Sequence, residues 1–135
     1  MEANSVQATT SVSNRNVSAP ALRTAFRIFV AWGLGNKEQI KLLGTPPKST
    51  FYRWKHGDDV TLSQDTLERL SYIFGIYAAL QVLLPKPEAA DTWIKKPNTA
   101  PLFGGRSALQ RMLSGQVADL YIVRQYLDAQ RGGWA

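Results

Sequence analysis

The sequence predicts an all-α protein, and three observations support this prediction. Apolar residues recur at helical spacing in several segments, for example at Leu22, Ala25, Phe26 and Phe29. No segment keeps the apolar–polar alternation that is typical of a strand. Glycine and proline residues separate the periodic segments, as expected where helices end. We therefore expect a series of helices joined by short turns and loops.

The first 84 residues divide into a tail and four helices. Residues 1–19 are rich in Ser, Asn, Thr, Val and Ala and keep no helical or strand period, so we expect a flexible tail. The first helix follows Pro20 and ends near Gly33. A short helix capped by Asn36 comes next. Two more helices are expected over residues 45–57 and 63–84.

The third and fourth of these helices differ in their faces. In the third, helical spacing predicts an apolar core side with Pro47, Phe51 and Trp54 and a polar, basic side with Ser49, Tyr52, Arg53 and His56. In the third, Thr45 is the expected cap, with Pro46 and Pro47 in the first turn. In the fourth, residues 72–84 are apolar around the whole helix but are fewer than the roughly 20 residues of a membrane span. We expect this helix to be buried by packing between subdomains or subunits. The sequence leaves open how its aromatic residues divide between a core and a dimer interface.

The C-terminal part is smaller and contains more proline. A short helix is expected over residues 88–95, followed by the loop KPNTAPLFGGR. Ser107 and Gln110 have the spacing of a capping box and open a helix that ends at Gly115. The last helix is expected from Gln116 to about Gln130. The expected division is therefore a tail (1–19), an N-terminal domain (20–84) and a C-terminal domain (85–135).

Composition excludes several classes of protein. The chain has 135 residues, enough for one compact domain or two very small ones. It has no cysteine and one histidine, His56, so we expect no disulfide, no metal site and no cofactor. No nucleophile has a histidine to activate it, and the acidic residues are mostly single, so we expect no catalytic residues and no enzyme. The N-terminus lacks the features of a secretory signal, which favours a cytoplasmic protein with no membrane partner.

The net charge of +6 is concentrated in one block. Residues 20–57 hold seven basic residues and one acidic residue, whereas residues 58–90 hold two basic and five acidic ones. A short basic block in a small domain is typical of a surface that meets phosphates, although a solvated helical face has the same composition.

The basic block contains a helix-turn-helix pattern, KEQIKLLG followed by TPPKSTFYRWKHG. In such a motif the second helix enters the major groove. Lysine can neutralise phosphates, hydroxyl groups can bond to phosphate or base edges, and arginine can recognise guanine through two bonds. The predicted DNA-binding residues are Asn36, Lys37, Lys48, Ser49, Thr50, Tyr52, Arg53 and Lys55.

The chain also resembles a known family. The runs LERLSYIFGIYAAL, AADTWIKKPNTAPLFGGRSALQRMLSG and VADLYIVRQYLDAQRGGW are similar to the antitoxins of the Xre/MbcA/ParS group, specifically those paired with RES-domain toxins. The resemblance covers residues 20–135 and is most specific in the C-terminal part. It implies an Xre-like helix-turn-helix bundle that represses its own operon, followed by a small helical toxin-binding domain.

In that family the RES toxin consumes NAD, and the antitoxin blocks access to its active site. The resemblance thus implies a cognate RES-domain toxin and operator DNA as partners, with a homodimer inside a toxin–antitoxin hetero-oligomer. Trp93, Asn98, Phe103, Leu113 and Gly115 also match the family pattern, and Trp93 and Leu113 are expected to pack rather than to contact the toxin. The residues expected to bind toxin are Gly104, Gly105, Arg106, Arg131, Gly132, Gly133 and Trp134.

Other interpretations of these residues stay open. Gly104, Gly105 and Arg106 form either an anion-holding loop or only a tight turn. The terminal RGGW is expected as a short flexible tail that enters a partner cleft, since Trp and Arg are enriched where partner pockets are filled, or else as a frayed end. The alternative function is a stand-alone helix-turn-helix regulator with a ligand-sensing C-terminal domain.

Overall fold

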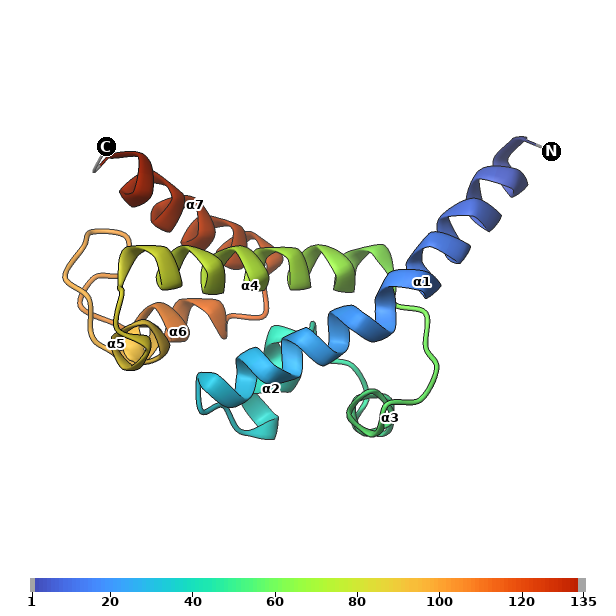
Figure 1. Cartoon of the computed structure of the whole chain (residues 1–135), viewed down its shortest axis with the longest axis horizontal. Coiled ribbons are helices and arrows are strands. Elements are labelled where there is room, and N and C mark those ends of the chain that lie inside the picture. The colour runs from blue at the N-terminus through green and yellow to red at the C-terminus, as the bar shows by residue number, and fades with distance from the viewer. Residues whose placement is uncertain (1, 134–135) are drawn as a thin grey trace.

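The all-α prediction is confirmed by a computed structural model, which describes the backbone of residues 2–133 and the side chains of residues 14–132 (Figure 1). No strand occurs within these residues. A 3₁₀ turn, η1, extends the fifth helix. The elements are α1 Glu2–Ala31, α2 Asn36–Leu42, α3 Lys48–His56, α4 Gln64–Leu83, α5 Pro87–Thr92, η1 Trp93–Lys95, α6 Ala108–Met112 and α7 Val117–Gly133.

The central element is α4, which packs against α1 and α7 (Figure 1). Ile73 and Ile76 of α4 are fully buried, and Leu80 is 1% exposed. A single apolar cluster runs from α1 through α4 to α7. The apolar circumference of α4 is therefore covered largely by other helices of the same chain, as expected for a helix between two subdomains.

The aromatic residues of α4 also pack within the chain. The Tyr77 ring lies 6.3 Å from Trp32 of α1, and the Tyr72 ring lies 5.5 Å from Tyr121 of α7, measured between ring centroids. The Tyr72 hydroxyl donates to a Glu68 carboxylate oxygen at 2.8 Å, and this bond raises the pKa of the Tyr72 phenol. Tyr72 and Tyr77 thus join the N-terminal and C-terminal parts.

Polar bonds add to this connection between the two parts. Lys95 Nζ of η1 donates to the Gly33 carbonyl at 2.9 Å, and Arg69 Nη2 of α4 donates to the Gly115 carbonyl at 3.2 Å. Where α4 passes α7, a β-carbon at Gly75 would overlap the Arg124 guanidinium. These contacts fix the C-terminal part against the helix-turn-helix part.

Within the described residues the flexible tail predicted over residues 1–19 is wrong, because α1 begins at Glu2 and includes Pro20 in its interior. Ser18 is fully buried, and its hydroxyl accepts from the Leu62 N–H at 2.8 Å. Asn14 Nδ2 donates to the Leu62 carbonyl at 3.1 Å. Because Leu62 lies more than 40 residues away in the sequence, these polar bonds produce no apolar periodicity within the segment. The helix was therefore not predicted from the sequence pattern.

Replacing Ser18 by alanine is expected to lower the free energy of unfolding by about 1–3 kcal/mol, because the buried Leu62 N–H loses its acceptor. Urea unfolding followed by circular dichroism measures this change. Thr24 of α1 is exposed, so Thr24→Ala is a control expected to stay within about 0.5 kcal/mol of the parent. Equal stability of Ser18→Ala and Thr24→Ala would refute a role for Ser18 in anchoring α1.

Caps or first residues were predicted for four helices. The Asn36 cap is wrong, because α2 begins at Asn36 and Gly35 is its N-cap. The predicted start of the fourth helix at residue 63 is confirmed, because Ser63 is the N-cap of α4 and its hydroxyl accepts from the Thr66 N–H at 3.1 Å. The capping box of Ser107 and Gln110 is also confirmed. The Thr45 cap is wrong, since α3 begins only at Lys48 with Pro47 as its N-cap. A residue before proline is disfavoured in the helical region, so Pro46 cannot join the helix.

None of the described helices is both long and apolar enough to cross a membrane. Likewise, residues 2–133 contain no group of three or more potential metal ligands that could hold an ion.

Candidate nucleic-acid interface and partner-binding region

The turn between α2 and α3 sets the geometry of the helix-turn-helix. Gly44 and Thr45 both have left-handed backbones, with φ of +90° and +57°. Glycine adopts this conformation without steric cost, whereas threonine does so rarely. The Gly44 N–H donates to the Lys41 carbonyl at 3.2 Å, and the Thr45 N–H donates to the Ile40 carbonyl at 2.9 Å. These bonds close the end of α2 and turn the chain toward α3.

Phe51 anchors α3 to the rest of the domain. Its side chain is fully buried, and its ring meets Phe26 of α1 edge to face at 6.0 Å. Lys48, Tyr52 and Arg53 are exposed. The predicted separation of α3 into a core side and a basic side therefore holds for these residues.

A polar cluster joins the start of α2 to α3. Lys55 Nζ donates to Asn36 Oδ1 at 2.9 Å, and Asn36 Nδ2 donates to the Tyr52 hydroxyl at 3.4 Å. The Lys55 ammonium also lies 5.4 Å from the Phe51 ring centroid and 5.8 Å from that of Phe26. Asn36, Tyr52 and Lys55 thus lie together, as the prediction of one DNA-binding surface requires. Lys55 in addition links the end of α3 to the start of α2.

The remaining predicted residues differ in exposure. Lys37, Ser49 and Arg53 are exposed, whereas Thr50 is half-buried and therefore less accessible to DNA. Neither Lys48 nor Arg53 forms an ion pair with another described residue. Both cationic side chains are therefore free to meet phosphates or base edges.

The predicted interface omitted two arginines of α1. Arg23 and Arg27 are exposed and line a groove that α1 forms with the last turn of α3. Both belong to the basic block of residues 20–57, which is the signal that would have included them. Because they come from a different helix, the spacing within the helix-turn-helix motif gave no sign of them.

The C-terminal loop is closed by backbone hydrogen bonds. The Asn98 N–H donates to the Arg106 carbonyl at 3.0 Å, and the Gly105 N–H donates to the Asn98 carbonyl at 2.9 Å. Gly104 and Gly105 have φ of +58° and +87°, and a β-carbon at either would meet no atom within 4 Å. The two glycines are therefore needed for the turn itself. Arg106 directly follows the turn and is exposed.

Phe103 attaches this loop to the core. It is 5% exposed, and its ring lies 6.0 Å from Trp93 of η1 and 5.3 Å from Tyr126 of α7. Trp93 stacks on Tyr126 at 6.4 Å. Phe103 is therefore a packing residue rather than a contact residue, and Trp93 packs as predicted. The cluster also places the loop beside the last turns of α7.

Arg111 was not among the residues predicted from the sequence, and its guanidinium group bonds to the loop. Its Nε donates to Asp119 at 2.9 Å, and its Nη1 donates to the Leu102 carbonyl at 2.9 Å. Ser114 also donates to the Asp119 carboxylate. Arg111 and Arg106 line the same hollow of about 300 Å³. The eight-residue separation of Arg111 and Asp119 crosses a helix boundary, so no helical spacing connected them.

The predicted flexible tail after Gln130 is wrong for residues 131–133, because α7 continues to Gly133. Arg131 and Gly132 are exposed at this end of the helix. Trp134 lies outside the described residues. The loop and the C-terminal end of α7 occupy the same end of the molecule, away from α3 (Figure 1).

The chain thus combines two units. One is a helix-turn-helix with a basic outer side, and the other is a helical unit with an arginine-containing loop closed by backbone hydrogen bonds. Residues 14–75 match the antitoxin Xre-like helix-turn-helix domain. Residues 79–133 match the antitoxin Xre/MbcA/ParS C-terminal toxin-binding domain. The chain belongs to the Xre/MbcA/ParS antitoxin family.

One curated relative shares most of the chain. The uncharacterized protein y4oB of Sinorhizobium fredii (strain NBRC 101917 / NGR234) is 52% identical over 124 residues, which cover 91% of this chain and 94% of that protein. No solved structure matches the chain.

Proposed function

We propose that this antitoxin neutralises a RES-type, NAD-degrading toxin by occluding its active site, and that it represses its own operon through α3. The observation that carries the proposal is the placement of the two parts. The loop between η1 and α6 and the C-terminal end of α7 lie at one end of the molecule, away from α3 (Figure 1). One chain can therefore hold toxin and operator DNA together, in the cytoplasm where both occur.

The toxin half is tested by mixing the purified full chain with a purified RES toxin and following NAD by absorbance after enzymatic coupling. We expect inhibition to increase with antitoxin until the toxin is saturated, because occlusion requires one bound antitoxin surface per active site. Unchanged NAD loss at a large excess of antitoxin would overturn a RES toxin as the partner.

The DNA half predicts distinct effects for two exposed side chains of α3. Arg53→Ala is expected to weaken specific operator binding by about 1–3 kcal/mol and to relax base preference, because a base contact is lost. Lys48→Ala is expected to weaken binding to all DNA sequences alike, because a phosphate contact is lost. The slope of log affinity against log salt concentration should then fall in magnitude by about 1. Gel-shift titrations at two salt concentrations separate these effects.

Lys86 provides the matched control, since it is exposed on the connection between α4 and α5 and lies outside the predicted interface. Lys86→Ala removes the same charge as Lys48→Ala and is expected to leave operator affinity within twofold. If Lys86→Ala and Arg53→Ala weakened binding equally, only the total charge would matter, and α3 would not be the recognition helix.

We infer that the operator-bound form is a homodimer, because helix-turn-helix proteins commonly pair two recognition helices on half-sites one turn apart. The apolar face of α4 is covered within the chain, so the dimer contact is expected on another surface. Light scattering of the free chain and of its toxin complex gives both stoichiometries. A strictly monomeric, operator-binding chain would contradict this inference.

A further inference from the structure

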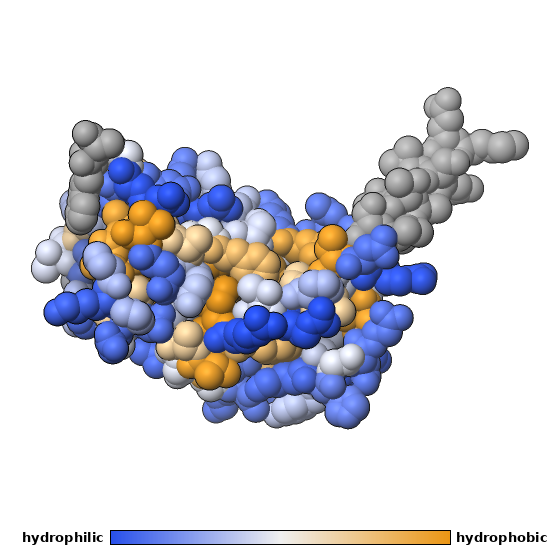
Figure 2. Space-filling view, in the orientation of Figure 1, coloured by the Kyte–Doolittle hydropathy of each residue, from blue (hydrophilic) through white to orange (hydrophobic). Residues whose placement is uncertain are grey.

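A groove lies between α1 and the end of α3, and the proposed function assigns no ligand to it. Its volume is about 580 Å³, within the range typical of small-molecule sites. Val30 at its edge is 78% exposed, so its side chain adds apolar surface at the mouth of the groove. Figure 2 shows apolar side chains alternating with strongly hydrophilic ones along α1. The lining residues are mainly apolar: Ala19, Leu22, Phe26, Val30 and Trp54, with Gly57 at one end.

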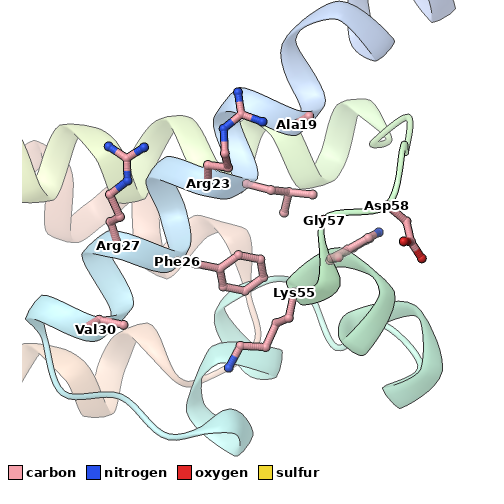
Figure 3. A pocket seen from close by; sticks show the side chains of 10 residues that line it. Ala19, Arg23, Phe26, Arg27, Val30, Lys55, Gly57 and Asp58 are labelled. Atoms are coloured by element: carbon pink, nitrogen blue, oxygen red, sulfur yellow. The ribbon is translucent and has the colours of Figure 1, made fainter.

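Cations surround this apolar lining. Arg23 and Arg27 extend from α1 on one side of Phe26, and Lys55 extends from α3 on the other (Figure 3). Neither arginine forms an ion pair with the described residues. The one acidic residue of the groove, Asp58, is bonded to His56 Nδ1 at 2.9 Å. The groove thus suits a ligand with an apolar body and an anionic group.

The length of the groove indicates the kind of apolar body. Along α1 it spans residues 19–30, eleven helical steps or about 16 Å. A bilayer core of about 30 Å contains two layers of acyl chains, so one chain spans a similar length.

We propose that this groove binds a free fatty acid, with the acyl chain along Phe26, Val30 and Trp54 and the carboxylate at the arginine side. The ion pair forms beside apolar surface, where charge-assisted bonds are stronger than in bulk water. Fatty-acid binding goes beyond toxin binding and operator binding, although Lys55 belongs both to the groove and to the predicted DNA-binding residues. It lies against the last turn of α3.

The test is isothermal titration calorimetry of the full chain with laurate below its micelle concentration. Val30→Asp places a carboxylate at the edge of the groove and is expected to weaken laurate binding at least tenfold. Val82→Asp makes the same change at an exposed position of α4, outside the groove, and is expected to bind like the parent. Circular dichroism checks that both variants fold.

The charge requirement is tested separately. The double variant Arg23→Gln with Arg27→Gln is expected to weaken laurate binding at least tenfold, whereas Lys86→Gln with Lys96→Gln removes two charges elsewhere and is expected to have little effect. Lauryl alcohol, which lacks the carboxylate, is expected to bind more weakly than laurate. Absence of saturable laurate binding, or equal affinity of the Val30→Asp and Val82→Asp variants, would overturn the proposal.

Discussion

Replacement of Phe51 by alanine is expected to lower the free energy of unfolding by about 3–5 kcal/mol, the usual cost of truncating a fully buried phenylalanine. Phe51 packs edge to face on Phe26, and the Lys55 ammonium lies over its ring. Truncation leaves a cavity between α1 and α3 and removes both contacts. Because Phe51 is the buried residue of α3, we expect the recognition helix to loosen first.

The neighbouring Tyr52 gives the control for this prediction. Its side chain is 51% exposed, so Tyr52→Ala is expected to cost about 1 kcal/mol or less. Urea unfolding gives both free energies, and hydrogen exchange of the α3 amides reports local loosening. Similar stability losses for Phe51→Ala and Tyr52→Ala would contradict the assignment of Phe51 as the anchor.

The second large effect is expected at Phe103. Phe103→Ala removes a nearly buried ring from between Trp93 and Tyr126, and we expect it to lower the free energy of unfolding by about 3–5 kcal/mol. The loop would then lose its attachment to α7. Toxin neutralisation, measured by NAD remaining in the mixture, should fall in parallel.

Arg106 lies three residues further along the same loop but is exposed. Arg106→Ala is expected to change stability by less than about 0.5 kcal/mol. It should nevertheless weaken toxin binding, because arginine is a common centre of interface energy. Comparing Phe103→Ala with Arg106→Ala therefore separates the effect of lost stability from the effect of a lost toxin contact. If Arg106→Ala neutralised toxin as well as the parent, the loop would serve only the fold.

Local signals that act within a few residues predicted most of the helices, although the Thr45 cap was wrong. The Ser63 cap and the Ser107 capping box open their helices as expected. The prediction for the N-terminal segment was wrong because Asn14 and Ser18 are fixed by hydrogen bonds to Leu62, which is far away in the sequence. A single-sequence pattern contains no information on such long-range polar pairing.

The candidate sites were predicted in part for the same reason. Helical spacing placed Phe51 inside and Arg53 outside, as the structure has them. It could not show that Lys55 reaches back to Asn36, or that Arg111 reaches Asp119, because these pairs join different helices. The glycine near the C-terminus, Gly132, suggested a flexible tail, yet it continues α7.

The central claim is that toxin and DNA are bound at separate ends of one chain. Its most direct test measures NAD protection and operator binding on the same two variants, Arg53→Ala and a chain shortened after residue 130. We predict that Arg53→Ala loses specific operator affinity and keeps NAD protection, and that the shortened chain does the reverse. Loss of both activities in either folded variant would contradict the claim.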